Sequence, residues 1–126
     1  MHKSKLAGFI IDCDTKDLDA AASFWGAALG MPLRQLPGPE NARYVRLEDL
    51  LDRLHVEVQQ VDHPSRVHLD IESDDVEAEV GRLEALGAKR VRQVGSWWVL
   101  EAPTGQRFCV VRAESARFAR EAREWS

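Results

Sequence analysis

The sequence predicts an α+β fold made of two βαβββ modules, because one order of elements occurs twice along its 126 residues. Segment 10–13 matches segment 68–71, and Ala28-Leu-Gly30 recurs as Ala85-Leu-Gly87. Each copy alone would leave one face of a small sheet uncovered. We therefore expect a single domain in which both copies form a curved eight-stranded mixed sheet around a pocket. Module one spans about residues 6–61 and module two about residues 66–112.

The first module begins with a strand and a helix. Residues 6–13 form a short apolar run rich in β-branched residues, which is typical of a strand. Asp17 is a favourable helix N-cap, apolar residues follow at helical spacing as far as Leu29, and Gly30 ends the helix. Alternating apolar and polar residues predict further strands at 44–47 and 54–61.

The second module repeats this order. Residues 66–71 predict a strand, and Asp74 with Glu77 predicts a capping box at the start of a helix that ends at Gly87. Three more strands are expected at 88–94, 97–101 and 107–112. Residues 114–126 are rich in Arg and Glu, and we expect them to form a C-terminal helical tail.

Composition excludes several classes of partner. The chain has 17 Lys and Arg against 21 Asp and Glu, and a net charge of −4 argues against binding to nucleic acid or an anionic membrane. The apolar run from Leu6 is too short for a signal peptide, and no run approaches a membrane span. The two cysteines form no CxxC motif. We expect a cytoplasmic protein with reduced thiols.

Several motifs occur in the order found in a known family. These are the helix at 17–30, the strand and helix at 68–88, and the closing hairpin at 97–111. Together they resemble glyoxalase-like proteins of the vicinal oxygen chelate superfamily, which includes glyoxalase I, extradiol dioxygenases, and bleomycin- and fosfomycin-resistance proteins. The resemblance implies a divalent metal with one ligand in the first and the last strand of each module. Such an ion can hold two neighbouring substrate oxygens.

This chain fills those ligand positions unevenly. His68 is the expected type of ligand, whereas Ile10 cannot bind a metal and Cys109 stands where metal-dependent relatives carry Glu. Glu57 or Gln59 is the nearest equivalent in the fourth strand. His68, Glu57 and Cys109 could still bind zinc and leave one position open. Because two of the four positions are changed, we expect no cofactor; the alternative is a divalent ion, Zn, Ni, Fe or Mn.

Other residues could act without a metal. Asp12 and Asp70 follow Ile10 and His68 by two residues, so each shares its neighbour's strand face. They could serve with His68 as acid/base catalysts, or they could bond nearby backbone amides. Trp97 and Trp98 point to opposite faces of a strand, so one of them could line a ligand site, as Tyr44 could at the equivalent place; both could also be core.

The function predicted from the sequence is the binding of a small organic molecule in the cavity of the sheet, without an intact metal site. The alternative is a metal-dependent lyase, isomerase or dioxygenase with His68 and Glu57 as ligands. Whether the protein is an enzyme stays open. The predicted ligand-binding residues are Tyr44, Glu57, Gln59, Trp97, Trp98 and Cys109. The resemblance also implies a homodimer. A second copy would also cover the large apolar side chain of Trp125, which lies on the polar tail.

Overall fold

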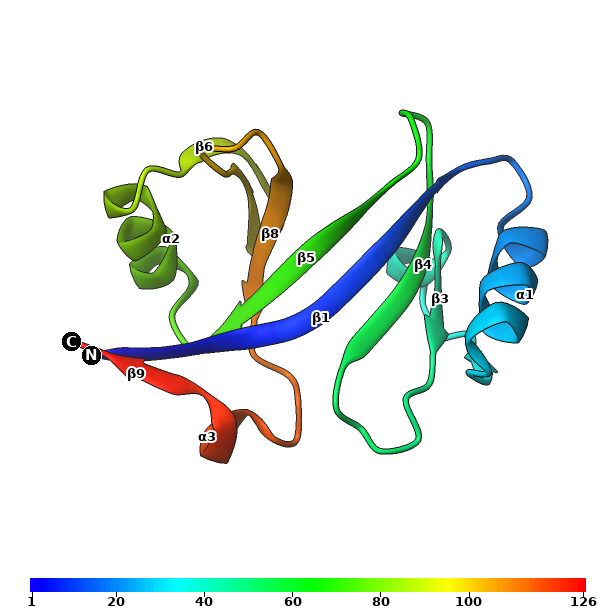
Figure 1. Cartoon of the computed structure of the whole chain (residues 1–126), viewed down its shortest axis with the longest axis horizontal. Coiled ribbons are helices and arrows are strands. Elements are labelled where there is room, and N and C mark those ends of the chain that lie inside the picture. The colour runs from blue at the N-terminus through cyan, green and yellow to red at the C-terminus, as the bar shows by residue number, and fades with distance from the viewer. The chain divides into compact units, whose positions relative to one another are not determined.

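The computed structural model repeats one order of elements twice, which confirms the βαβββ prediction (Figure 1). All 126 residues are described, and they divide into a first unit, residues 8–67, and a second unit, residues 1–7 and 68–126. The elements are β1 His2–Asp14, α1 Leu18–Leu29, β2 Leu33–Arg34, a 3₁₀ turn Pro39–Asn41, β3 Tyr44–Leu47, β4 His55–Val61, β5 Arg66–Ser73, α2 Val76–Ala85, β6 Lys89–Val94, β7 Trp97–Glu101, β8 Arg107–Arg112, α3 Phe118–Glu121 and β9 Arg123–Trp125.

The first unit orders its strands β2-β3-β4-β1. Strands β1 and β4 run parallel, whereas β3 is antiparallel to both β4 and β2. Helix α1 begins as predicted at Asp17, whose side chain accepts a hydrogen bond from the Ala20 amide at 3.0 Å, and it ends at Gly30, where φ is 67°. Strand β2 was not predicted, because two exposed residues carry no readable alternation.

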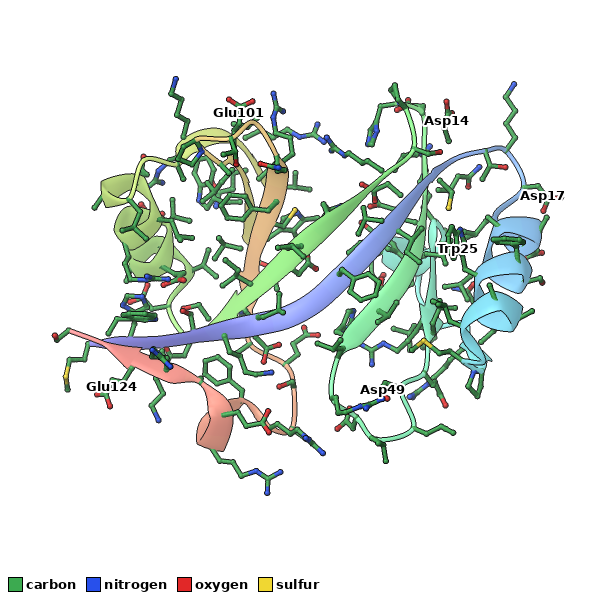
Figure 2. All side chains as sticks on the ribbon, viewed as in Figure 1. Asp14, Asp17, Trp25, Asp49, Glu101 and Glu124 are labelled. Atoms are coloured by element: carbon green, nitrogen blue, oxygen red, sulfur yellow. The ribbon has the colours of Figure 1, made fainter.

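One face of this small sheet packs on α1. The core is made of alternate strand residues with one helix residue at its centre: Ile11, Val45, Leu47, Val56, Val58 and Ala22. Trp25 of α1 packs against this core from the helix side (Figure 2). The alternation therefore leaves the other set of strand side chains on the face that is turned away from α1.

The second unit orders its main strands β5-β8-β7-β6, with β5 and β8 parallel and the other pairs antiparallel. Helix α2 covers a core of Val80, Leu100 and Val110. The prediction that Asp74 caps this helix is wrong by one residue: the cap is Asp75, which accepts from the Ala78 amide at 3.0 Å. Asp74 instead accepts a hydrogen bond from the Lys3 amide at 2.8 Å.

The C-terminal segment also differs from its prediction. Instead of a helical tail over 114–126, it forms the short helix α3 and then strand β9, which pairs antiparallel with the start of β1. Tertiary contacts explain the strand, because Trp125 donates its indole N–H to Ser4 Oγ at 2.9 Å and its ring lies 3.8 Å from the Arg82 guanidinium carbon. The Trp125 side chain therefore packs against residues of its own chain, whereas the sequence analysis expected a second copy to cover it. No helix is long and apolar enough to cross a membrane.

Candidate functional site

A row of hydrogen-bonding side chains lies on the face of the first unit that is turned away from α1. We call it the first polar face. Register places Tyr44 opposite Gln59 and Arg46 opposite Glu57 on β3 and β4, and it places Asp12 of β1 opposite Gln59. Strand alternation adds His55 to the same face. Of these residues, the sequence analysis named Tyr44, Glu57, Gln59 and Asp12 as site residues.

Three of these side chains form a continuous chain of contacts. Glu57 Oε1 lies 2.5 Å from His55 Nε2, and an Arg46 Nη2 group lies against His55 Nδ1. Because a guanidinium only donates hydrogen bonds, Nδ1 is the acceptor and Nε2 carries the proton that is shared with Glu57. The Glu57 side chain is 11% exposed and that of His55 28%. Arg46 Nε is buried and has no acceptor.

Arg46 and His55 are the two residues of this face that the sequence analysis did not name as site residues, and Arg46 carries its positive charge. The available signal was its position in strand 44–47, two residues after Tyr44 and therefore on the same face. Tyr44 itself accepts a hydrogen bond from Gln59 Nε2 at 2.9 Å through its phenol oxygen. A donor-rich row thus runs across β3 and β4, with Glu57 as its fixed negative charge.

Asp12 has a different environment. It is only 2% exposed, and its Oδ2 lies 3.4 Å from Arg66 Nε, within the same unit. Asp12 is thus a buried ion-paired carboxylate rather than a carboxylate bonded only to backbone amides.

A second polar face lies on β5 and β8 of the second unit. His68 and Asp70 alternate along β5, and Asp70 stands directly opposite Cys109 on the parallel strand β8. The possible ligand atoms of these three residues all lie within 4.8 Å of one another. His68 Nε2 is 3.4 Å from Asp70 Oδ1, and the two side chains are 10% and 14% exposed. The sequence analysis paired His68 with Cys109 as metal ligands and with Asp70 as an acid/base residue, and the structure brings all three together.

The donor set of the second polar face suits a divalent ion such as zinc. Imidazole nitrogen, carboxylate oxygen and thiolate sulfur are all common zinc ligands, and three of them leave an open position. Tetrahedral bond lengths require donor separations of about 3.5 Å. His68 and Asp70 already meet this at 3.4 Å, and the most widely separated pair would have to close by about 1 Å. Asp70 takes the place that the sequence analysis gave to Glu57, whose carboxylate is held by His55 in the first unit.

The two neighbouring tryptophans of β7 are separated by the strand's alternation. Trp98 stands opposite Val110 and packs against the core under α2, and the Arg90 guanidinium carbon lies 4.8 Å from the centre of its ring. Trp97 therefore belongs to the opposite face, the one that carries Cys109. Of the two, Trp97 is the residue that can contact a ligand beside the second polar face.

Comparisons with known proteins identify the family of this chain. The family model described as "Glyoxalase-like domain" matches residues 9–111. A hypothetical protein from Bacillus halodurans C-125 has a TM-score of 0.65 at 14% identity, over 90% of this chain and 97% of that one. Methylmalonyl-CoA epimerase from Mycobacterium tuberculosis gives 0.63 at 16%, over 86% and 88%.

A methylmalonyl-CoA epimerase solved in complex with methylmalonyl-CoA and NH4+ gives a TM-score of 0.60 at 16% identity, covering 90% of this chain and 97% of that one. No curated protein matches the sequence. At these identities the solved structures support the fold, and the family model covers most of the chain. The chain therefore belongs to the glyoxalase-like domain family, within the vicinal oxygen chelate superfamily.

Proposed function

We propose that this protein binds a small organic molecule through the carboxylate or carbonyl oxygens of that molecule, on the first polar face and without a resident metal. The observation that carries the proposal is the half-buried Arg46, which His55 and Glu57 orient on the sheet face turned away from α1. Guanidinium groups bind carboxylates in a fixed fork geometry. The phenol of Tyr44 adds a second donor beside it.

The same contacts argue against Glu57 as a metal ligand. Its Oε1 already receives a hydrogen bond from His55, and its cross-strand neighbour is a permanently charged arginine. A cation at Glu57 would be repelled by that guanidinium in a partly desolvated place. Methylmalonyl-CoA bound to a solved relative of this fold is in keeping with a small-molecule ligand.

Calorimetric titration of the full chain tests the proposal. The probes are pyruvate, 2-oxobutyrate and malonate, which present carboxylate oxygens alone or beside a carbonyl. We expect binding by the unchanged protein and a Kd raised about tenfold or more in Arg46→Gln, since one charge-assisted hydrogen bond contributes about 1.5–3 kcal/mol. Arg43→Gln is the control, because Arg43 is exposed just before β3. Equal affinities of the two variants, or no heat with any probe, would contradict the proposal.

A second candidate function is a metal-dependent lyase, isomerase or dioxygenase, and the clustering of His68, Asp70 and Cys109 favours it. The three side chains would hold the ion, which when bound would polarise a substrate carbonyl. Metal analysis of protein purified without chelator separates the two candidates. Stoichiometric zinc, nickel, iron or manganese that is lost in Cys109→Ser and kept in Glu57→Gln would replace the metal-free proposal.

A further inference from the structure

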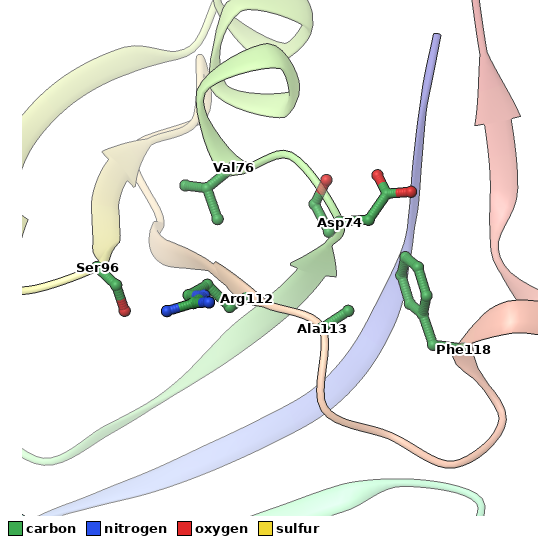
Figure 3. Close-up of a pocket in the computed structure, with 7 residues that line it drawn as sticks. Asp74, Val76, Ser96, Arg112, Ala113 and Phe118 are labelled. Carbon is green, nitrogen blue, oxygen red and sulfur yellow. The ribbon is translucent and has the colours of Figure 1, made fainter.

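A pocket lies in the second unit, where β5 and β8 end (Figure 3). Its volume is about 390 Å³, within the range of small-molecule sites. The residues that matter for its chemistry come from four separate stretches of the chain: Ser73, Asp74, Val76, Ser96, Arg112 and Phe118. No residue of the first unit contributes to it.

This pocket is separate from the second polar face. Arg112 follows Val110 by two residues on β8, so both point to the side of the sheet that α2 covers. Cys109 points to the opposite side, together with Asp70. A ligand in the pocket would therefore contact none of the residues invoked in the proposed function.

The frame of the pocket is fixed by internal hydrogen bonds. Ser73 is 1% exposed, and its hydroxyl donates to the Lys3 carbonyl at 2.8 Å and accepts from the Asp75 amide at 3.1 Å. The Asp74 amide donates to the same Lys3 carbonyl at 3.3 Å. The hydrogen bonds of the Ser73 hydroxyl are therefore used to hold the end of β5 in place. A ligand in the pocket would interact with the charged side chains around Ser73 instead.

Two opposite charges border the pocket, and they do not pair with each other. Arg112 is exposed and has no acidic partner, while Asp74 uses Oδ1 to accept from the Lys3 amide and keeps Oδ2 without a hydrogen bond. Figure 3 shows Arg112 and Ser96 on one side of the pocket, and Asp74 with Phe118 on the other. The formal charge of the lining is zero, but its two ends differ in sign.

We propose that this pocket binds a small zwitterion, a molecule with a carboxylate at one end and an ammonium group at the other. The carboxylate pairs with Arg112 beside the Ser96 hydroxyl, as guanidinium geometry favours. The ammonium pairs with Asp74 next to the Phe118 ring, whose face attracts cations. Val76 contacts the apolar part between them. A simple anion or a simple cation would leave one charged end unused.

Amide NMR titrations of the full chain test this assignment. The zwitterionic probes are γ-aminobutyrate and ε-aminocaproate, which differ in charge separation; caproate and hexylamine each carry only one of the two charges. We expect ε-aminocaproate or γ-aminobutyrate to shift the amides of Ser96, Ala113 and Phe118, with a lower Kd than either singly charged probe.

Two variants and one control complete the experiment. Arg112→Gln should raise the Kd of the zwitterion about tenfold, at the lower end for a charge-assisted bond at an exposed site, and leave hexylamine binding unchanged. Asp74→Asn keeps an oxygen for the Lys3 amide and should weaken hexylamine and the zwitterion alike. Arg92→Gln, on exposed β6, is the control. Caproate binding as tightly as the zwitterion, equal effects of Arg112→Gln and Arg92→Gln, or unshifted pocket amides would overturn the proposal.

Discussion

Glu79 of α2 provides a stringent test of what holds the second unit together. Its side chain is 0% exposed. Its Oε1 accepts from His2 Nε2 and from Arg82 Nε, and its Oε2 accepts from Arg82 Nη2, each at 2.8 Å. The Trp125 ring covers Arg82 from β9. One carboxylate thus connects the helix to both ends of the chain.

Replacement of Glu79 by Ala should lower the free energy of unfolding by about 3 kcal/mol. Removing one partner of a buried ion pair costs about 3–5 kcal/mol, because the other charge is left without compensation. Arg82 is 25% exposed and can regain water, which places the expected loss at the lower end of that range. Urea unfolding followed by circular dichroism measures it.

Glu77→Ala is the matched control on the same helix. Its side chain is 69% exposed and pairs with Arg90, and surface pairs of this kind contribute little. The urea midpoint of that variant should stay close to that of the unchanged protein. If both variants shift the midpoint equally, the buried network does not carry the stability assigned to it.

The same carboxylate predicts a pH dependence. Burial opposes ionisation of Glu79, but hydrogen bonds from Arg82, His2 and Ser4 outweigh it and hold its pKa below the usual 4.5. A pKa that is lower in the folded state adds stability that is present above 4.5 and is lost as the pH falls through the folded-state value. Glu79→Gln should therefore lose less stability on acidification than the unchanged protein.

Three further predictions concern the first unit and the helix caps. Gly8→Ala should lower the free energy of unfolding by more than about 3 kcal/mol in urea, because a Cβ would lie 1.9 Å from the His55 carbonyl oxygen and overpacking alone costs about 1–3 kcal/mol. Burial raises the pKa of the Cys13 thiol, so iodoacetamide should alkylate it more slowly at neutral pH than it alkylates a free cysteine, as mass spectrometry would show. Asp17→Ala and Asp75→Ala should each cost about 1 kcal/mol of unfolding free energy through loss of an N-cap, and an unchanged thermal midpoint in either would count against the capping geometry.

Elements with strong local patterns were predictable from the sequence. Strands β3, β7 and β8 have the predicted bounds, and α1 has its predicted cap and end. Elements that depend on distant partners were not. Strand β9 pairs with residues at the opposite end of the chain, and its local Arg/Glu composition favours a helix. The cap of α2 moved from Asp74 to Asp75 because Lys3, far away in sequence, binds the first of the two carboxylates.

The candidate site shows the same division. Alternation alone puts Glu57 and Gln59 on one strand face, and the structure agrees. The meeting of Asp70 with Cys109 depends on the register between β5 and β8, which no periodicity in either strand specifies. The sequence analysis grouped His68 and Cys109 with Glu57, whereas the structure brings them together with Asp70.

The choice between metal-free and metal-dependent function depends on which carboxylates already interact with positively charged or hydrogen-bonding side chains of the protein. Glu57 is committed to His55 and faces Arg46, so its negative charge is balanced by protein groups. Asp70 contacts His68 at 3.4 Å and has no Lys or Arg partner. A cation would therefore gain more at Asp70 than at Glu57, whereas an anionic ligand would gain more at Arg46. The first polar face thus favours an anionic ligand and the second polar face favours a cation. Ligand titration of Arg46→Gln tests the first preference, and metal analysis of Cys109→Ser tests the second.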